Sequence, residues 1–370
     1  MSAPASVEVI ARDGAARVAT VRLPAGSFTT PCFMPVGTRA SVKALDSADV
    51  EGAGAEVLLA NAYHLMLRPG AAVVAAAGGV GEFSAWRGLT LTDSGGYQAY
   101  SLGAPVDDDG INFRSVYDGS RARLTPESAV EVQEQLGADI QMVLDVCAPW
   151  PSPVQELRSA VERTDAWARR AKRAHRRSDQ ALFGIVQGGC DLALRRESAE
   201  RSATTGFDGY GIGGLSVGEP REEMLAALAA AIAALPEDRP RYLMGVGDAV
   251  GIVEAVALGV DMFDCVAPTR AARHGTILTD AGRFSLRRAA WAGDTAPLEE
   301  GCACPTCSRY SRAYLRHLLV VREPSALRLL SIHNLAWVFR LLDRVRAAVR
   351  ANALDGLRRE VAATWGGEGI

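Results

Sequence analysis

The chain has 370 residues and a formal net charge of −3, with 48% hydrophobic and 22% charged residues. This length allows a large buried core, and this composition is that of a globular protein, which excludes disordered and fibrous classes. Because the charge is close to zero, the molecule as a whole is no basic nucleic-acid binder, and a polyanion would need a local basic patch.

The amino-terminal segment predicts a β-hairpin. Residues 7–10 and 17–23 alternate apolar and polar side chains around Asp13-Gly14, a pair typical of hairpin turns. We expect this hairpin to lie as a lid over one end of the fold. The residues before it lack the pattern of a signal peptide, and no later run approaches the ~18 apolar residues of a membrane span. We therefore expect a cytoplasmic protein with no membrane partner.

Eight short apolar runs follow, each separated from the next by a segment compatible with a helix. Parallel strands covered on both faces are apolar throughout, and eight of them alternating with helices predict the α/β class and a (β/α)₈ TIM barrel. The runs are Cys32–Val36, Glu56–Ala60, Leu89–Thr92, Ile140–Leu144, Leu182–Val186, Tyr210–Leu215, Tyr242–Val246 and Met262–Cys265.

Several helix ends between these runs carry capping signals. Thr125-Pro126 predicts an N-cap followed by proline in the first turn, and Ser152-Pro153-Val154-Gln155 predicts a capping box closed by Gln155. A further helix from Asp248 to Leu258 is expected to end at Gly259.

Polar residues stand where the apolar runs end: Asp93, Asp145, Gln187, Gly213-Gly214 and Asp264. In a TIM barrel the carboxyl ends of the strands face one mouth, where active sites lie, so these residues should converge. A single aspartate at such a junction is more often a turn former or a helix cap. Three at one mouth repel each other, which favours roles as acid, base or nucleophile.

The last run leads directly into a cationic segment. We interpret residues 261–270 as a buried strand that ends on an acid, breaks at Pro268 and presents Arg270, Arg273 and His274 on a loop. Guanidinium groups bind phosphate well, although arginine is common along the whole chain. Asp264 beside these arginines is our candidate nucleophile for chemistry on a nucleic acid.

An insertion separates the eighth strand from its helix. It starts with a hairpin-like stretch and contains Cys302, Cys304 and Cys307, and the helical period resumes at Ile332 with His333 as the first residue of the helix. Three thiolates and an imidazole form a closed tetrahedral shell, which predicts one structural Zn²⁺ ion. We divide the chain into a barrel domain (1–276), a zinc-binding insertion (277–332) and a final barrel helix with a C-terminal helix (333–370).

Two glycine-containing stretches suit a flat ligand. In residues 91–98, glycines allow close approach and Tyr97 can stack on a ring, although a turn with Tyr97 in the core fits equally well. Residues 209–214 resemble part of a dinucleotide fingerprint, but no helix opens on them, so a Rossmann site is not expected. The amides of Gly213 and Gly214 better suit a planar base.

Together these motifs resemble bacterial tRNA-guanine transglycosylase. The resemblance covers nearly the whole chain in order, and it agrees with the barrel and the zinc site. The stretches that carry it are Thr92–Gln98, Gly184–Gly189, Gly213–Glu219, Phe263–Arg270 and the Cys-x-Cys-x₂-Cys…His set of Cys302, Cys304, Cys307 and His333.

The resemblance implies a pentosyltransferase that exchanges guanine at the wobble position of a tRNA with a GUN anticodon. The incoming base is 7-aminomethyl-7-deazaguanine, the precursor of queuosine, and zinc is the cofactor. By the same resemblance, Asp264 attacks the ribose and forms a covalent tRNA intermediate, and Asp93 is the general acid and base. This is the two-carboxylate logic of retaining glycosidases applied to a nucleoside.

The resemblance also implies the remaining contacts. Base binding falls to Tyr97, which stacks, to Asp145, Gln187 and the amide of Gly214 on the guanine-like edge, and to the Leu215 carbonyl and Glu219 near the aminomethyl cation. Arg270 and Arg273 hold the splayed anticodon, and the zinc insertion grips the tRNA backbone. The family is typically homodimeric, so a homodimer is expected.

The chain departs from the family pattern at two positions. Val146 replaces an acid after Asp145, and His274 stands where asparagine is common, so the choice of base is less well specified than the reaction. Cys147 suits the small bacterial base better than queuine. For His64, His175 and His317 a structural or solvated position is favoured.

Three alternatives are considered. The archaeal branch of the family carries added C-terminal domains, which this chain does not show. A non-catalytic, tRNA-binding partner subunit of the same family would have no need of both Asp93 and Asp264. A glycoside hydrolase would have no use for the zinc insertion or for the arginines after Asp264.

Overall fold

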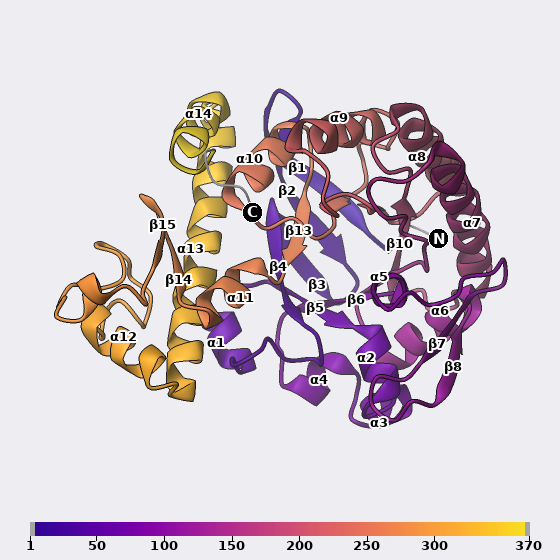
Figure 1. Ribbon diagram of the computed structural model, residues 1–370. Coiled ribbons are helices and arrows are strands. Elements are labelled where there is room, and N and C mark those ends of the chain that lie inside the picture. Colours follow the sequence, from indigo (N-terminus) through magenta and orange to yellow (C-terminus); the bar gives the residue numbers. More distant parts are fainter. Residues whose placement is uncertain (1–3, 367–370) are drawn as a thin grey trace.

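The computed structural model describes residues 4–366 and contains a closed barrel of eight parallel strands (Figure 1). The strands follow each other around the barrel in chain order, and the last pairs with the first through Phe263 opposite Phe33. They are β4 (Cys32–Gly37), β5 (Val57–Asn61), β6 (Leu89–Asp93), β9 (Ile140–Met142), β10 (Ala181–Val186), β11 (Gly209–Ile212), β12 (Arg241–Leu243) and β13 (Met262–Cys265). The predicted TIM barrel is confirmed.

Three strands are shorter than the apolar runs that predicted them. β9, β11 and β12 end at Met142, Ile212 and Leu243, two or three residues before the runs do. After β9, Val143 and Leu144 stay buried, and the Val143 amide still donates to the Phe183 carbonyl at 3.0 Å, but the regular strand pairing has ended. An apolar run therefore marks burial, and the strand is only its ladder-forming part.

Helices surround the barrel and cover the outer faces of its strands (Figure 1). A small hairpin, β7 (Ile111–Arg114) with β8 (Arg121–Leu124), interrupts this series after the third barrel strand. The helices are α1 (Ser47–Gly52), α2 (Ala62–Leu67), α3 (Ala71–Ala76), α4 (Val80–Ser84), α5 (Gly96–Ser101), α6 (Pro126–Leu136), α7 (Val154–Ala174), α8 (Leu192–Thr205), α9 (Arg221–Ile232) and α10 (Ala249–Ala257).

Two of the three predicted helix ends are confirmed. The Thr125 side chain accepts from the Ser128 amide at the start of α6, and α10 runs from its N-cap Asp248 to the left-handed Gly259. The predicted capping box at the start of α7 is wrong. Pro153 is the N-cap there, and since its side chain has no acceptor, Gln155 has no partner for a reciprocal bond.

The amino-terminal hairpin closes the amino end of the barrel. β1 (Ser6–Asp13) and β2 (Ala16–Leu23) pair as predicted, and β3 (Gly26–Thr30) adds a third strand. Arg17 of β2 is fully buried and binds both carboxylate oxygens of Asp261, the residue before β13, at 2.8 and 2.6 Å. A buried, bidentate ion pair therefore fixes the lid to the barrel.

The insertion after β13 forms a separate unit beside the barrel, drawn in orange in Figure 1. It consists of α11 (Ala267–Arg273), β14 (Thr276–Thr279), β15 (Gly282–Ser285), a 3-10 turn (Ala289–Trp291) and α12 (Arg312–Val320). The predicted hairpin is confirmed in β14 and β15. The predicted loop after Asp264 is wrong, because Pro268 lies in the first turn of α11, where a missing N–H is tolerated, and the arginines sit on this helix.

α13 (Pro324–Arg350) joins the insertion to the barrel and is followed by α14 (Leu354–Trp365). Its predicted start at His333 is wrong, since the helix begins nine residues earlier, and a boundary between 332 and 333 cuts through it. Ala326 and Leu330 pack into the core of the insertion, whereas Leu342 and Val345 pack into the core of the barrel. One rigid helix thus belongs to both cores (Figure 1).

Within residues 4–366, no helix has the length and apolar character needed to cross a bilayer. The first three and last four residues of the predicted ranges lie outside the described residues.

Candidate active site and metal centre

Asp93 ends β6 at the carboxyl end of the barrel and is held by two donors from the neighbouring strand. The Asn61 side chain donates to its Oδ2 at 2.6 Å, and the Ala62 amide donates to its Oδ1 at 3.0 Å. Asn61 also caps α2 by accepting from the His64 amide at 3.1 Å. The start of α2 therefore fixes the orientation of the Asp93 carboxyl group.

Asp264 lies in β13 and receives two hydrogen bonds on one oxygen. The Tyr242 hydroxyl donates to Oδ1 at 2.5 Å, and the Gly245 amide donates to the same atom at 2.8 Å. Among residues 4–366 no donor holds Oδ2. One carboxylate oxygen is anchored and the other is left for chemistry.

The two carboxyl groups influence each other's ionisation. Burial raises the pKa of Asp93 to about 7, and the charge of Asp264 adds to this shift. Burial also raises the pKa of Asp264, against the hydrogen bonds from Tyr242 and Gly245, which lower it. No cation within residues 4–366 forms an ion pair with either group. Near neutral pH the pair can hold one proton, so one member can be an acid while the other is an anion.

Asp145 and Gln187 come together from neighbouring strands. The Gln187 amide donates to Asp145 Oδ2 at 2.6 Å, and both side chains are buried. Burial raises the pKa of Asp145 to about 6, against that hydrogen bond. A Cβ at Gly96 would collide with Asp145, and one at Gly214, whose φ is +63°, would collide with Gln187. The glycines of both loops are needed for this close approach.

A buried arginine that the sequence did not reveal holds the loops beside Asp145 and Gln187. Arg195 of α8 has no exposed surface and donates to carbonyl groups of two separate stretches, one from the end of β10 into the loop before α8 and one directly after β11. Its partners are the carbonyls of Val186 at 3.0 Å, Gly189 at 2.6 Å, Gly213 at 2.7 Å and Gly214 at 3.0 Å. Desolvation lowers its pKa to about 10, so it stays charged at neutral pH.

The remaining predicted base-binding residues lie on neighbouring loops. Leu215 is buried, and Glu219 accepts from the amides of Ser216 and Val217, which closes the loop between them. Tyr97 of α5 is 56% exposed, so the reading that places it in the core is wrong. An exposed ring at the mouth can stack on a ligand.

Arg270 and Arg273 lie on α11, which begins three residues after Asp264. Arg270 is exposed and Arg273 is half-buried, and burial together with the charge of Arg270 lowers the pKa of Arg273. The helix is fixed from α13, since the Asn334 side chain donates to the Pro268 carbonyl at 3.0 Å. His274 bonds through Nδ1 to the Arg270 carbonyl at 2.7 Å. Two adjacent cations on a fixed helix favour an anion.

The four predicted metal ligands come together in the insertion. Their donor atoms all lie within 4.8 Å of one another, and His333 Nδ1 is 3.7, 3.6 and 3.3 Å from the sulfurs of Cys302, Cys304 and Cys307. Donors of a tetrahedral ion bound at 2.0–2.3 Å stand about 3.6 Å apart, so the set fits Zn²⁺. His333 Nε2 lies 2.9 Å from the Leu278 carbonyl, which directs Nδ1 to the cysteines.

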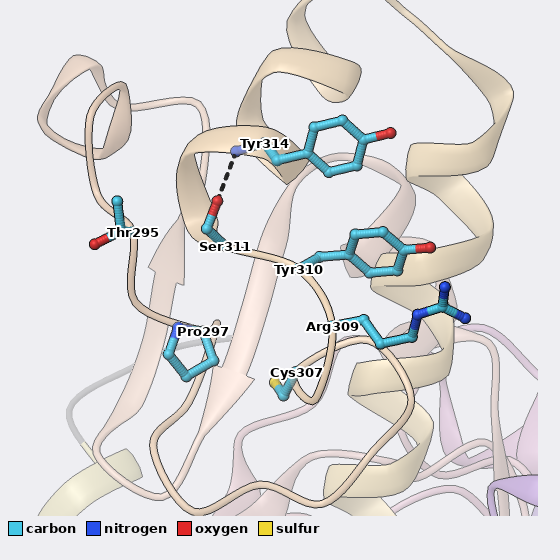
Figure 2. A pocket seen from close by; sticks show the side chains of 7 residues that line it. All are labelled: Thr295, Pro297, Cys307, Arg309, Tyr310, Ser311 and Tyr314. Atoms are coloured by element: carbon cyan, nitrogen blue, oxygen red, sulfur yellow. Dashed lines mark hydrogen bonds between the residues drawn. The ribbon is translucent and has the colours of Figure 1, made fainter.

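A cavity of about 330 Å³ lies elsewhere in the insertion (Figure 2). The rings of Tyr310 and Tyr314 are stacked with centroids 5.5 Å apart, and Arg309 lies over the Tyr310 ring. Apart from Cys307 its walls contain no predicted site residue. The lining residues are Thr295, Pro297, Cys307, Arg309, Tyr310, Ser311 and Tyr314.

Comparison with known proteins identifies the family of this chain. The family described as "Queuine tRNA-ribosyltransferase" matches residues 13–367. Proteins of that name are 50% identical in Symbiobacterium thermophilum, over 97% of this chain and 91% of the relative, and 50% identical in Syntrophobacter fumaroxidans, over 95% of each. A third, from Thermus thermophilus, is 49% identical over 97% of this chain and 94% of the relative. The chain belongs to the queuine tRNA-ribosyltransferase family of pentosyltransferases.

Proposed function

We propose that this protein exchanges guanine at the wobble position of a tRNA with a GUN anticodon for 7-aminomethyl-7-deazaguanine. The observation that carries the proposal is the pair of uncompensated carboxyl groups, Asp93 and Asp264, at the mouth of a barrel of this family. Unpaired carboxylates cost stability and are retained where they do chemistry.

The first half of the reaction forms a covalent intermediate. Asp264 Oδ2 attacks the ribose C1′, the bond from C1′ to N9 of guanine breaks, and Asp93 gives its proton to the departing base. The hydrogen bonds to Oδ1 of Asp264 keep Oδ2 turned outward and stabilise the carboxylate before the attack. The raised pKa of Asp93 keeps its proton available near neutral pH.

The second half reverses these roles with a different base. Asp93, now an anion, takes a proton from the incoming base, whose nitrogen attacks C1′ and displaces Asp264. Atoms balance as one guanine released for one base incorporated, with no redox change. Bond formation and cleavage at one carboxylate retain the sugar configuration, as in retaining glycosidases.

The base pocket follows from the buried polar cluster. Asp145, Gln187 and the Gly214 amide offer acceptors and a donor for the polar edge of a guanine-like ring, and Tyr97 offers a stacking surface. The Leu215 carbonyl and Glu219 would attract the aminomethyl cation. Glu219 already accepts two backbone amides, so its contribution is mainly the negative field of its carboxylate.

The tRNA would be bound outside the base pocket. Arg270 and Arg273 would contact the splayed anticodon, and the zinc insertion would contact the backbone. We also infer a homodimer, tested by light scattering, and a location in the cytoplasm with the tRNA.

The zinc site holds the insertion on α13. Replacing Cys304 by Ser should release the ion and weaken tRNA binding, because the insertion loses a ligand that ties it to His333. Metal content measured by mass spectrometry and binding measured by filter retention test this. Cys190→Ser, a cysteine outside the cluster, is the control, and metal retained by the Cys304 variant would exclude it as a ligand.

The experiment for the activity itself is incorporation of labelled guanine into unmodified tRNA. The proposal predicts incorporation into tRNAs with a GUN anticodon and none when the wobble guanine is replaced by adenine. Absence of incorporation into any tRNA would leave the non-catalytic partner subunit as the better description.

A further inference from the structure

The loops after β4 and β5 occupy a defined place at the barrel mouth. In the barrel order these two strands lie between β13 and β6, the strands that carry Asp264 and Asp93. Arg39 lies in the loop after β4, and His64 and Arg68 lie in and directly after α2, which follows β5. A nucleotide that reaches both carboxyl groups must pass next to these loops.

Tyr117, from the turn between β7 and β8, gathers these residues into one cluster. The guanidinium carbon of Arg68 is 4.7 Å from the centre of its ring, and that of Arg39 is 5.3 Å from it. Its hydroxyl lies 3.2 Å from Nδ1 of His64. An aromatic face attracts cations, so the ring offsets the repulsion between the two arginines. We call Arg39, Arg68 and Tyr117 the mouth patch.

The mouth patch has positive charge without a carboxylate partner. Arg39 and Arg68 are exposed, and neither forms an ion pair within residues 4–366, in contrast to exposed arginines such as Arg169, which pairs with Asp165. Burial and the charge of Arg39 lower the pKa of His64, which is therefore neutral at pH 7. Asp118, the acid next to Tyr117, is engaged by Ser120 within its own turn.

The patch is also linked to the catalytic machinery. His64 lies on α2, whose capping residue Asn61 donates to Asp93. α2 thus carries His64, which contacts Tyr117, in its middle, and its N-cap Asn61 contacts Asp93. A ligand bound at the mouth patch would sit beside the reacting carboxyls.

We propose that the mouth patch binds a phosphodiester of single-stranded RNA next to the exchanged nucleotide, a contact that rests on the proposed function and adds to it. Two unpaired guanidinium groups supply the anion site, and the Tyr117 ring holds them in place. Guanidinium groups bind the backbone of any sequence, so the patch adds affinity and leaves the choice of tRNA to other contacts.

The test compares Arg39→Ala, Arg68→Ala and the double variant with wild type, using an anticodon stem-loop RNA in a filter-binding assay over a range of salt. Loss of each phosphate contact should weaken binding about tenfold at low salt and reduce the slope of log affinity against log salt by about one. The exchange reaction should show a higher KM for tRNA with kcat unchanged. The matched control is Arg196→Ala, which changes an exposed arginine of α8 that forms no ion pair within residues 4–366, and it should behave as wild type.

A purely structural patch gives a different result. If the arginines only hold the β7–β8 hairpin, the double variant should melt at a lower temperature while its salt slope equals that of Arg196→Ala, and this overturns the proposal. Tyr117→Phe keeps the ring and should bind RNA as wild type does, whereas Tyr117→Ala should bind more weakly.

Failure of the patch and failure of the proposed function are separable. If the double variant incorporates guanine normally with an unchanged KM for tRNA, the patch does not bind tRNA, and the proposed exchange activity still stands. The opposite result is a wild-type protein that incorporates no guanine but whose RNA binding loses salt dependence when the patch is mutated. That result would support the patch as an RNA-binding site and contradict the proposed exchange activity.

Discussion

The two ends of β13 carry the same kind of side chain in opposite circumstances. Asp261, just before the strand, is fully buried and bound through both oxygens by Arg17 of the lid. Asp264, three residues on, faces the open mouth and receives only hydroxyl and amide donors. The two environments suit different roles. The carboxylate paired with a cation stabilises the lid, whereas the carboxylate without a cation has an oxygen left to react.

This difference predicts opposite effects for apparently similar substitutions. Neutralising a residue at the closed end should damage folding and spare the reaction in the molecules that still fold. At the open end, neutralisation should spare folding and damage the reaction. The following variants test the two halves, beginning with the largest expected effect.

Asp264→Asn should lower kcat for guanine exchange by about 10⁴-fold, because an amide cannot displace the base from the ribose. Single-turnover release of labelled guanine from tRNA measures this. Asp261→Asn is the control on the same strand, and its rate per folded molecule should stay near wild type. Equal loss of activity in both variants would mean that Asp261 and Asp264 do not differ in their importance for the reaction.

Arg17→Met should lower the free energy of unfolding by about 3–5 kcal/mol, because it leaves Asp261 buried without its cation. Urea unfolding followed by circular dichroism measures the change. Arg22→Met, on the same strand but in the exposed pair with Glu8, should cost at most about 1 kcal/mol. A similar cost at both positions would mean that the lid is not locked by the buried pair.

Arg195→Met should raise KM for guanine about 10–100-fold, because the carbonyl groups of the base pocket lose their shared donor. Its neighbour Arg196, which is exposed, gives the matched control as Arg196→Met. If Arg195→Met binds the base as wild type does and only its melting temperature falls, Arg195 has a purely structural role.

Asp93→Asn should stabilise the fold by about 0.5–2 kcal/mol at pH 8 while abolishing the acid step. The pKa of Asp93 is raised to about 7 in the folded state, so the folded protein holds this proton more tightly than the unfolded chain. Its ionisation therefore lowers wild-type stability as pH rises from about 4 to about 7. The variant should show a smaller decline between pH 5 and pH 8 in unfolding experiments, because Asp145 and Asp264 still contribute to it. An equal decline in both proteins would contradict this.

The barrel was predictable because buried parallel strands are apolar runs, and the polar residues after them mark the mouth. The start of α13 was not predictable, because its first turns pack on the insertion and its later turns pack on the barrel. The apolar periodicity recognised from Ile332 onward reflects only the packing on the barrel. Pro268 looked like a break, but a proline is compatible with the first turn of a helix.

Arg195 shows a different limit. Arginine on a helix usually lies in solvent, and no local pattern indicates that this one reaches carbonyl groups of two separate stretches. Only the fold brings those stretches together. The candidate catalytic aspartates were accessible from sequence because they lie at strand ends, whereas residues that act through contacts between distant loops were not.

The most direct test of the central claim is the site of the covalent bond. Wild-type protein is mixed with tRNA in the absence of added base, denatured and digested with nuclease and protease, and the peptides that carry a ribose are identified by mass spectrometry. If Asp264 is the nucleophile, the modification should lie on Asp264 and be absent from the Asp264→Asn protein. A ribose attached to Asp93 or Asp145, or an adduct that survives in the Asp264→Asn protein, would contradict it.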